Sequence, residues 1–339
     1  MTTKLRWGLL GTGGIARKFA AGLRESETGE LVAIGSRSID SAQKFAADFP
    51  ARVHGTYEAL LGDPNVEVVY ISTPHPWHAE WSIKAAAAGK HILCEKPLTM
   101  NHAEAIAVVE AARTNGVFLM EAFMYRCHPQ TARLVELIRA DAIGRVQLVQ
   151  ATFSFRTVHE LSNRLFNNAL GGGGILDVGC YCSSMARLIA GAADGMAFAD
   201  PVKVKGAGLI GHESRVDEAA TALLKFDNGV LAQLAAGVRM KLDSCVRIWG
   251  EEGHIEIPSP WIVRSGTEQS KIILQIDGVP REEIIIASDR GLYAIEADTV
   301  ARFIETKEAP AMTWADSLGN MRSLDRWRAE IGMVYDSER

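Results

Sequence analysis

Residues 7–16 read WGLLGTGGIA, an apolar run, Trp7–Leu10, that leads directly into a glycine-rich loop. The loop matches the pattern G-x-G-x-x-A, in which Gly11 permits a tight turn, Gly13 lets the backbone approach a pyrophosphate, and Ala16 allows a helix to pack closely on a strand. A helix that starts here points its amide N–H groups at that phosphate. Glycine loops also serve as plain turns, but this context predicts a Rossmann domain that binds a dinucleotide. The expected contacts are Gly11, Thr12, Gly13, Gly14 and Ile15.

The first third of the chain alternates short apolar runs with helical patterns. Alternation of strands and helices predicts right-handed βαβ units and a parallel sheet. The expected strands are Trp7–Leu10, Leu31–Ser36, Val66–Ser72, His91–Glu95 and Val117–Met120. The expected helices are Ile15–Glu25, Ser41–Phe49, His78–Ala88 and His102–Asn115, the last of them capped by Asn101 with Glu104 three residues later.

The pattern changes near residues 120–125, where we expect the boundary between two domains. A helical segment, Gln130–Ala140, is followed by consecutive strand patterns and turns, which are typical of an open, mostly antiparallel sheet. The expected strands are Val146–Phe155, Val202–Ile210, Glu218–Asp227, Val230–Gly237, Ser244–Trp249, Gly253–Ile257 and Lys271–Ile276. Helical patterns return at Leu292–Thr306 and Trp314–Gly332. We therefore predict an α/β protein with a Rossmann domain in residues 1–122 and an α+β domain in residues 123–339, whose C-terminal helix can pack back on the first domain.

Composition excludes several classes of protein. The 339 residues are 47% hydrophobic and 23% charged, with a net charge of −5, so no global field favours nucleic acid or an anionic membrane. No segment approaches about 18 uncharged apolar residues, and the N-terminus lacks the pattern of a signal peptide. The 5 cysteines form no CxxC pair and indicate a reducing compartment. We expect a cytoplasmic protein with neither nucleic acid nor membrane as a partner.

The end of the second strand bears on which nucleotide is bound. A site that prefers NAD places an acid near this point, where it binds the ribose 2′-hydroxyl. This chain has Ser36 and Arg37 instead, which suit a 2′-phosphate through charge-assisted hydrogen bonds. The alternative is a solvated loop arginine. We predict that the cofactor is NADP(H), with NAD(H) as the second choice.

Two further loops follow strands of the expected sheet, at the edge where ligands bind in open parallel sheets. One contains Glu95, Lys96 and Pro97, and the other spans residues 72–78. We expect them to face the nicotinamide half of the cofactor through Thr73, Pro74, His75, His78, Glu95 and Lys96. Pro97 stiffens its turn, and the isomer of the Lys96–Pro97 bond stays open. His75 and His78 are spaced closely enough to suggest a metal, but no convincing third ligand accompanies them, so we expect no metal.

Five motifs together resemble a known family. They are GTGGIA (11–16), STPHPWH (72–78), CEKP (94–97), EAFMYRCHPQ (121–130) and GGGGILDVGCYCSSMARLIAG (171–191). They cover nearly the whole chain and are similar to the Gfo/Idh/MocA family of oxidoreductases. Within it, they most resemble the branch of the dimeric dihydrodiol dehydrogenases, D-xylose dehydrogenases and glucose–fructose oxidoreductases. The resemblance implies a Rossmann domain followed by an open, mostly antiparallel sheet whose face helps to form the substrate cleft.

The resemblance also implies roles for particular residues. It places Lys96 of the EKP motif beside nicotinamide and substrate, and it gives a second catalytic role to the D-x-G-x-H/Y motif, here Asp177 to Tyr181. Many relatives, including inositol dehydrogenases, have histidine where this chain has Tyr181, which favours the tyrosine-bearing branch. Arg164 resembles a position near nicotinamide or substrate, and a surface loop arginine is its alternative.

The chemistry of these residues agrees with such roles. Asp177 and Tyr181 share one face if residues 176–189 are helical. A free tyrosine has a pKa near 10, and an adjacent ammonium such as Lys96 lowers it toward the range of a useful base. We expect Tyr181 to exchange a proton with a substrate hydroxyl, Lys96 to polarise the same oxygen, and Asp177 to position a substrate hydroxyl or Lys96. The alternatives are a solvated turn lysine, a core tyrosine and an aspartate that only caps a helix.

The leading hypothesis is an NADP-dependent oxidoreductase that acts on a sugar, a sugar derivative or a cyclic diol. Two alternatives are a glycosidase that retains NAD and a non-enzymatic regulator that binds a dinucleotide. The first strand starts almost at once, without the cofactor-wrapping arm of periplasmic relatives, so we expect an exchangeable cofactor. An open sheet with one uncovered face also predicts a homodimer or homotetramer.

Overall fold

The computed structural model describes residues 4–261 and 270–339. The chain folds into two compact units, one of which comprises the chain up to His128 together with Asp289–Ser317. The other comprises Pro129–Ser288 and Leu318–Arg339. The chain thus leaves the first unit after His128, forms residues 129–288 of the second unit, and returns to the first unit with residues 289–317. Among the described residues, none of the helices combines the length and the apolar character that a bilayer crossing requires.

The first unit is built on a six-stranded parallel sheet with the order β3-β2-β1-β4-β5-β6. The strands are β1 (Leu5–Leu10), β2 (Gly29–Gly35), β3 (Arg52–His54), β4 (Val68–Ile71), β5 (His91–Glu95) and β6 (Leu119–Ala122). The helices of this unit are α1 (Gly14–Leu23), α2 (Ile39–Asp48), α3 (Tyr57–Leu61), α4 (His78–Ala87), α5 (His102–Asn115), α6 (Met124–Cys127) and α9 (Leu292–Phe303). This strand order is that of a dinucleotide-binding Rossmann fold, whose ligand crevice lies between β1 and β4.

Local sequence explains where these elements begin and end. Every residue of β4 (VVYI) is buried, as expected of a central parallel strand. Asn101 caps α5 by accepting the amide N–H of Glu104 at 3.0 Å, and Gly116 ends the same helix in a left-handed conformation with φ +63°. The start signal read from the sequence is therefore the one the helix uses.

The second unit is built on an eight-stranded sheet with the order β14-β13-β12-β11-β7-β10-β9-β8. Its strands are β7 (Val146–Ser154), β8 (Lys203–Ile210), β9 (Asp217–Lys225), β10 (Leu231–Gly237), β11 (Cys245–Gly250), β12 (Gly253–Ile257), β13 (Ser270–Ile276) and β14 (Glu282–Ile286). Its helices are α7 (Pro129–Arg139), α8 (Cys180–Ala192) and α10 (Trp314–Glu330), whose first turn belongs to the first unit. All neighbouring strands are antiparallel except β7 and β10, which are parallel.

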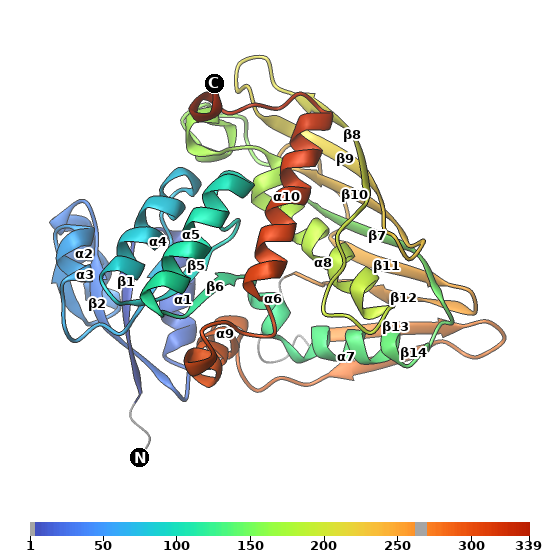
Figure 1. Ribbon diagram of the computed structural model, residues 1–339, viewed down its shortest axis with the longest axis horizontal. Helices are drawn as coiled ribbons and strands as arrows, with labels where there is room; N and C mark the ends of the chain where they lie inside the picture. Colours follow the sequence, from blue (N-terminus) through green and yellow to red (C-terminus); the bar gives the residue numbers. More distant parts are fainter. Residues whose placement is uncertain (1–3, 262–269) are drawn as a thin grey trace. The chain divides into compact units, whose positions relative to one another are not determined.

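Helices cover one face of this second sheet (Figure 1). Every residue of α8 is buried, including the small side chains of Cys180 and Cys182. On β9 the alternate residues Ala222 and Leu224 point to this covered face, whereas Leu223 is 58% exposed on the other. The predicted fold class, a Rossmann domain joined to an open, mostly antiparallel sheet, is confirmed.

Candidate active site

The glycine loop at the end of β1 is shaped to approach a ligand. Gly11 has φ +112°, and a methyl group there would lie 2.9 Å from Oγ of Ser72, so the turn requires glycine. Gly13 and Gly14 are exposed, and a methyl group on either would meet open space. In the described part of the chain no side chain caps α1. The first amides of α1 are thus available to an anion.

The basic side chain of Arg37 follows β2, at the position where Rossmann folds bind the ribose of a dinucleotide. Ser36 is buried and its Oγ accepts the amide N–H of Ser38 at 3.4 Å. The exposed guanidinium of Arg37 lies 5.0 Å from the centre of the Trp77 ring. Burial raises the pKa of Tyr57, and the positive charge of Arg37 nearby partly offsets that rise. Sequence reasoning passed over Trp77, although it stands inside the STPHPWH motif.

His78 joins the two loops that follow β4 and β5. Its ring is fully buried, with Nδ1 2.9 Å from the carbonyl oxygen of Pro97 and Nε2 2.8 Å from that of Thr73. His78 therefore ties the STPHP loop to the turn that carries Lys96. No group of three or more His, Cys, Asp and Glu side chains in residues 4–261 and 270–339 is placed to hold a metal ion.

Glu95 binds the backbone of the turn that contains Lys96. Its buried carboxylate accepts a hydrogen bond from the hydroxyl of Tyr70, and its Oε2 accepts the backbone N–H of Lys96 at 3.2 Å. Lys96 is half-buried, and the Lys96–Pro97 bond is cis. The sequence left two roles open for Glu95, orientation of Lys96 or contact with the cofactor. These bonds favour the first.

Further acids lie in the interior behind this turn. Burial raises the pKa of Glu296 well above its ordinary value, and the negative charge of Glu95 raises it further. Burial likewise raises the pKa of Tyr70 well above 10.0. Glu296 therefore favours its neutral form. No sequence pattern pointed to it, because α9 is separated from β5 by residues 129–288 of the second unit.

The second unit pairs Arg164 with Asp177. Nη2 of Arg164 donates to Oδ1 of Asp177 at 2.6 Å, so Arg164 is not a free surface arginine. Asp177 lies in a π-helical turn, Ile175–Gly179, that runs directly into α8. This turn is one residue wider than the α-helix that the sequence predicted for the segment.

Tyr181 stands in the first turn of α8, against two aromatic rings. It is 4% exposed, and its ring contacts Phe153 edge-on at 5.3 Å and Trp261 at 5.8 Å. The indole N–H of Trp261 donates to the carbonyl of Thr152 at 3.0 Å, which fixes that ring. The tyrosine ring is therefore held on its sides.

The predicted site residues thus form two groups. The cofactor residues and Lys96 belong to the first unit, whereas Arg164, Asp177 and Tyr181 belong to the second. The pairing of Lys96 with Tyr181 stays a prediction.

Comparison with known proteins identifies the class. Residues 5–123 match the oxidoreductase family with an NAD-binding Rossmann fold, and residues 131–256 match the GFO/IDH/MocA C-terminal domain. D-xylose 1-dehydrogenase (NADP(+)) 2 of Haloferax volcanii is 34% identical over 95% of each chain. Trans-1,2-dihydrobenzene-1,2-diol dehydrogenase of Mus musculus is 36% identical over 99% of each chain. KijD10, a 3-ketoreductase from Actinomadura kijaniata solved with NADP and TDP-benzene, is 27% identical, with a TM-score of 0.88 over 97% of this chain and 98% of that one.

These matches define a dinucleotide-dependent oxidoreductase. The chain belongs to the Gfo/Idh/MocA family. The family predicted from the motifs is confirmed, and the sugar and diol dehydrogenases among the relatives agree with the predicted branch.

Proposed function

We propose that this protein is an NADP-dependent oxidoreductase that interconverts a hydroxyl and a carbonyl on a sugar, a sugar derivative or a cyclic diol. The observation that carries the proposal is the open glycine turn at the start of α1, with a cation, Arg37, where an NAD site has an acid. Relatives named for NADP, D-xylose and a dihydrodiol support the same reading.

The described residues fit an NADP molecule. The amides after Gly13 suit the pyrophosphate, and Ser36 with Arg37 suits the 2′-phosphate. When bound, the nicotinamide ring of NADP supplies the hydride acceptor or donor for the reaction. In this proposal the first unit binds the cofactor, and the second unit binds substrate and forms the contact between subunits.

In this proposal, side chains of the protein transfer the proton of the substrate hydroxyl. In the oxidation of an alcohol, Tyr181 removes the hydroxyl proton while the ammonium of Lys96 donates a hydrogen bond to the same oxygen. Asp177, held by Arg164 at 2.6 Å, positions a neighbouring hydroxyl of the substrate. In the reduction of a carbonyl the proton returns from Tyr181 to the oxygen.

A coupled absorbance screen tests the activity. Aldoses, inositols and cyclic diols are offered with NADP+, and keto-sugars with NADPH, while absorbance at about 340 nm is followed. Turnover of at least one class supports the proposal. Turnover of glycosides without a net change in absorbance would instead support a glycosidase, and silence across both panels would support a regulator.

Cofactor choice gives a separate prediction. Arg37→Ala raises the KM for NADP+ at least about tenfold and leaves that for NAD+ within about twofold, because only the 2′-phosphate loses a charged hydrogen bond. Steady-state kinetics with both cofactors provide the measurement. Arg133→Ala, at an exposed arginine of α7 paired with Glu136 at 3.0 Å, is the control. Equal kcat/KM values for the two cofactors in the wild type would overturn the preference.

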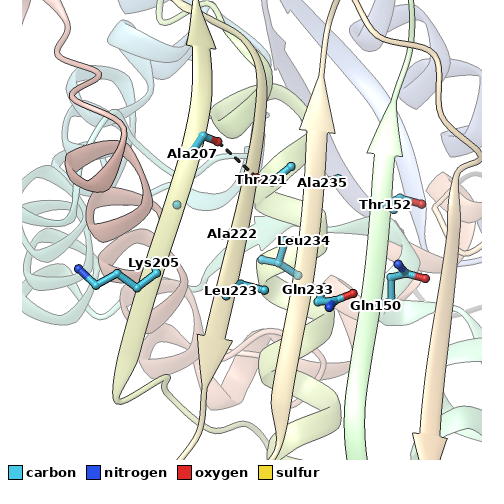
Figure 2. Close-up of a pocket in the computed structure, with 11 residues that line it drawn as sticks. Gln150, Thr152, Lys205, Ala207, Thr221, Ala222, Leu223, Gln233, Leu234 and Ala235 are labelled. Atoms are coloured by element: carbon cyan, nitrogen blue, oxygen red, sulfur yellow. Dashed lines mark hydrogen bonds between the residues drawn. The ribbon is translucent and has the colours of Figure 1, made fainter.

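We also propose that a second copy of this chain covers the open face of the sheet in the second unit. A hollow of about 460 Å³ lies on this face. Figure 2 shows the residues that line it, which come from β8, β9, β10 and β7. Lys205, Leu223, Gln233 and Gln150 lie side by side across the strands in register. Apart from Lys205, whose charge is paired with Glu330 at 2.9 Å, the residues that line the hollow are uncharged. Interface cores between identical subunits are similarly depleted of charge.

Light scattering at micromolar concentration tests this surface. The wild type is expected at two or four times the 36.8 kDa of one chain, and Leu223→Glu shifts it toward one. Ile106→Glu, on the exposed side of α5, is the matched control and leaves the mass unchanged. A wild-type mass of a single chain would contradict the proposal.

The cellular compartment stays a prediction. All five cysteines carry free thiols, which supports the reducing, cytoplasmic setting expected from the sequence.

A further inference from the structure

Asp217 is a buried acid that the proposed mechanism does not use. It is the first residue of β9 and is fully buried. Its Oδ2 accepts the backbone N–H of Ile175 at 2.6 Å. Ile175 is the first residue of the π-helical turn that contains Asp177 and leads into Tyr181. The carboxylate therefore binds the chain at the point where the site-bearing segment begins.

The glycine run that precedes Ile175 encloses this carboxylate. A methyl group on Gly173, which has φ +104°, would lie 2.2 Å from Oδ1 of Asp217. A methyl group on Gly174 would lie 2.8 Å from Cα of Gly237 in β10. Glycine at both positions lets the loop close over Asp217 and against the sheet. The four-glycine stretch is thus packed against the carboxyl group of Asp217.

The carboxyl group of Asp217 is held through one of its two oxygens, Oδ2. Its Oδ1 has no hydrogen-bond partner in the described part of the chain. Burial raises the pKa of Asp217 to about 7, while the backbone amides of Ile175 and Gly174 and the positive charge of Arg328 act in the opposite direction. Burial, and with it the negative charge of Asp217, raises the pKa of Tyr335, and Arg328 is itself paired with Asp325 and Glu338.

A second tether holds the same loop from the C-terminal end of the chain. The hydroxyl of Tyr335 donates to the carbonyl of Gly172 at 2.7 Å. Asn168 donates to the carbonyl of Val334 at 3.1 Å and accepts the N–H of Asp336 at 2.7 Å. These bonds fix the loop before Gly173. The first amide of the π-helical turn itself, that of Ile175, donates to Asp217.

We infer that Asp217 is a positioning residue, which sets the placement of Asp177 and Tyr181 by holding the amide of Ile175. Its fully buried carboxyl group acts through the backbone amide of Ile175. The kinetic consequence of this role rests on the function proposed above, whereas the structural consequence does not. The two can therefore be tested separately.

The experiment compares Asp217→Ala, Asp217→Asn and the control Asp227→Ala in the full-length protein. Asparagine keeps an oxygen that can accept the Ile175 amide, alanine removes it, and Asp227 is an exposed acid in the turn after β9. Hydrogen–deuterium exchange of the peptide spanning residues 165–182 reports on the loop. Kinetics with NADP+ and a substrate from the screen report kcat and both KM values.

We expect Asp217→Ala to speed amide exchange in this peptide at least tenfold and to lower kcat about tenfold, with the KM for NADP+ within about twofold. Asp217→Asn restores most of the protection from amide exchange and most of kcat. Asp227→Ala matches the wild type in both measurements. Unchanged exchange in Asp217→Ala, or an asparagine variant no better than alanine, would overturn the positioning role. A wild type without turnover on any substrate would refute the proposed function, and exchange alone would then decide the role of Asp217.

Discussion

We expect Lys96→Ala and Tyr181→Phe each to lower kcat about a thousandfold, while the affinity for NADP(H) stays within about twofold. Lys96→Ala removes the hydrogen bond from the ammonium group to the reacting oxygen. Tyr181→Phe removes the hydroxyl group that exchanges the proton. Phenylalanine keeps the ring contacts of Tyr181 with Phe153 and Trp261, so the loss is chemical rather than structural. Steady-state kinetics give kcat, and quenching of protein fluorescence by NADPH gives the affinity.

Lys84→Ala is the control for the lysine. Lys84 is an exposed residue of α4, paired with Glu80 at 2.6 Å, and its removal leaves kcat unchanged. The proposed mechanism is wrong if Lys96→Ala and Tyr181→Phe both turn over at nearly the wild-type rate with cofactor bound.

The second large effect concerns stability, at a buried ion pair of the first unit. Nη2 of Arg126 lies 2.6 Å from Oδ2 of Asp316, and the two side chains are 3% and 2% exposed. The carboxylate of Asp316 helps to raise the pKa of Arg126 against the effect of its burial. Asp316→Ala leaves the guanidinium buried without its counter-charge, and we expect a loss of about 3–5 kcal/mol in the free energy of unfolding. Urea unfolding followed by circular dichroism measures it.

Glu110→Ala provides the comparison, because its partner Arg113 is also an arginine of the first unit but the pair is exposed. Exposed pairs contribute little, so this variant loses less than about 1 kcal/mol. Similar losses in the two variants would show that burial does not set the cost of breaking the Arg126–Asp316 pair.

Sequence reasoning succeeded where a structural feature has a local cause. The sequence patterns that predict the glycine turn at Gly11, the strand β4 and the cap at Asn101 each lie within a few residues. It missed β3, which has three residues and so shows no periodicity, and β14, whose sequence EEIII lacks alternation. It also had no means of finding that β7 and β10 are parallel, because side chains alternate in the same way in parallel and antiparallel strands.

The same distinction applies to the candidate site. The EKP and D-x-G-x-H/Y motifs predicted Lys96, Asp177 and Tyr181 as site residues. They gave no sign that Arg164 binds Asp177 or that Asp217 holds Ile175, because each partner comes from a separate segment that only the folded backbone brings close. A single sequence contains no signal for such pairs beyond the charge of the residues themselves.

The interrupted first unit has a consequence for synthesis on the ribosome. Asp298 of α9 accepts hydrogen bonds from Ser26 and Thr28, just before β2, and α9 also buries Ala294 and Val300. The six parallel strands leave the ribosome early, but α9 follows only after the part of the second unit that ends at Ser288, on the order of ten seconds or more later. Throughout that interval the first unit lacks α9, which packs against α1 and α6. The surface that α9 later covers is where we expect a chaperone to bind the growing chain.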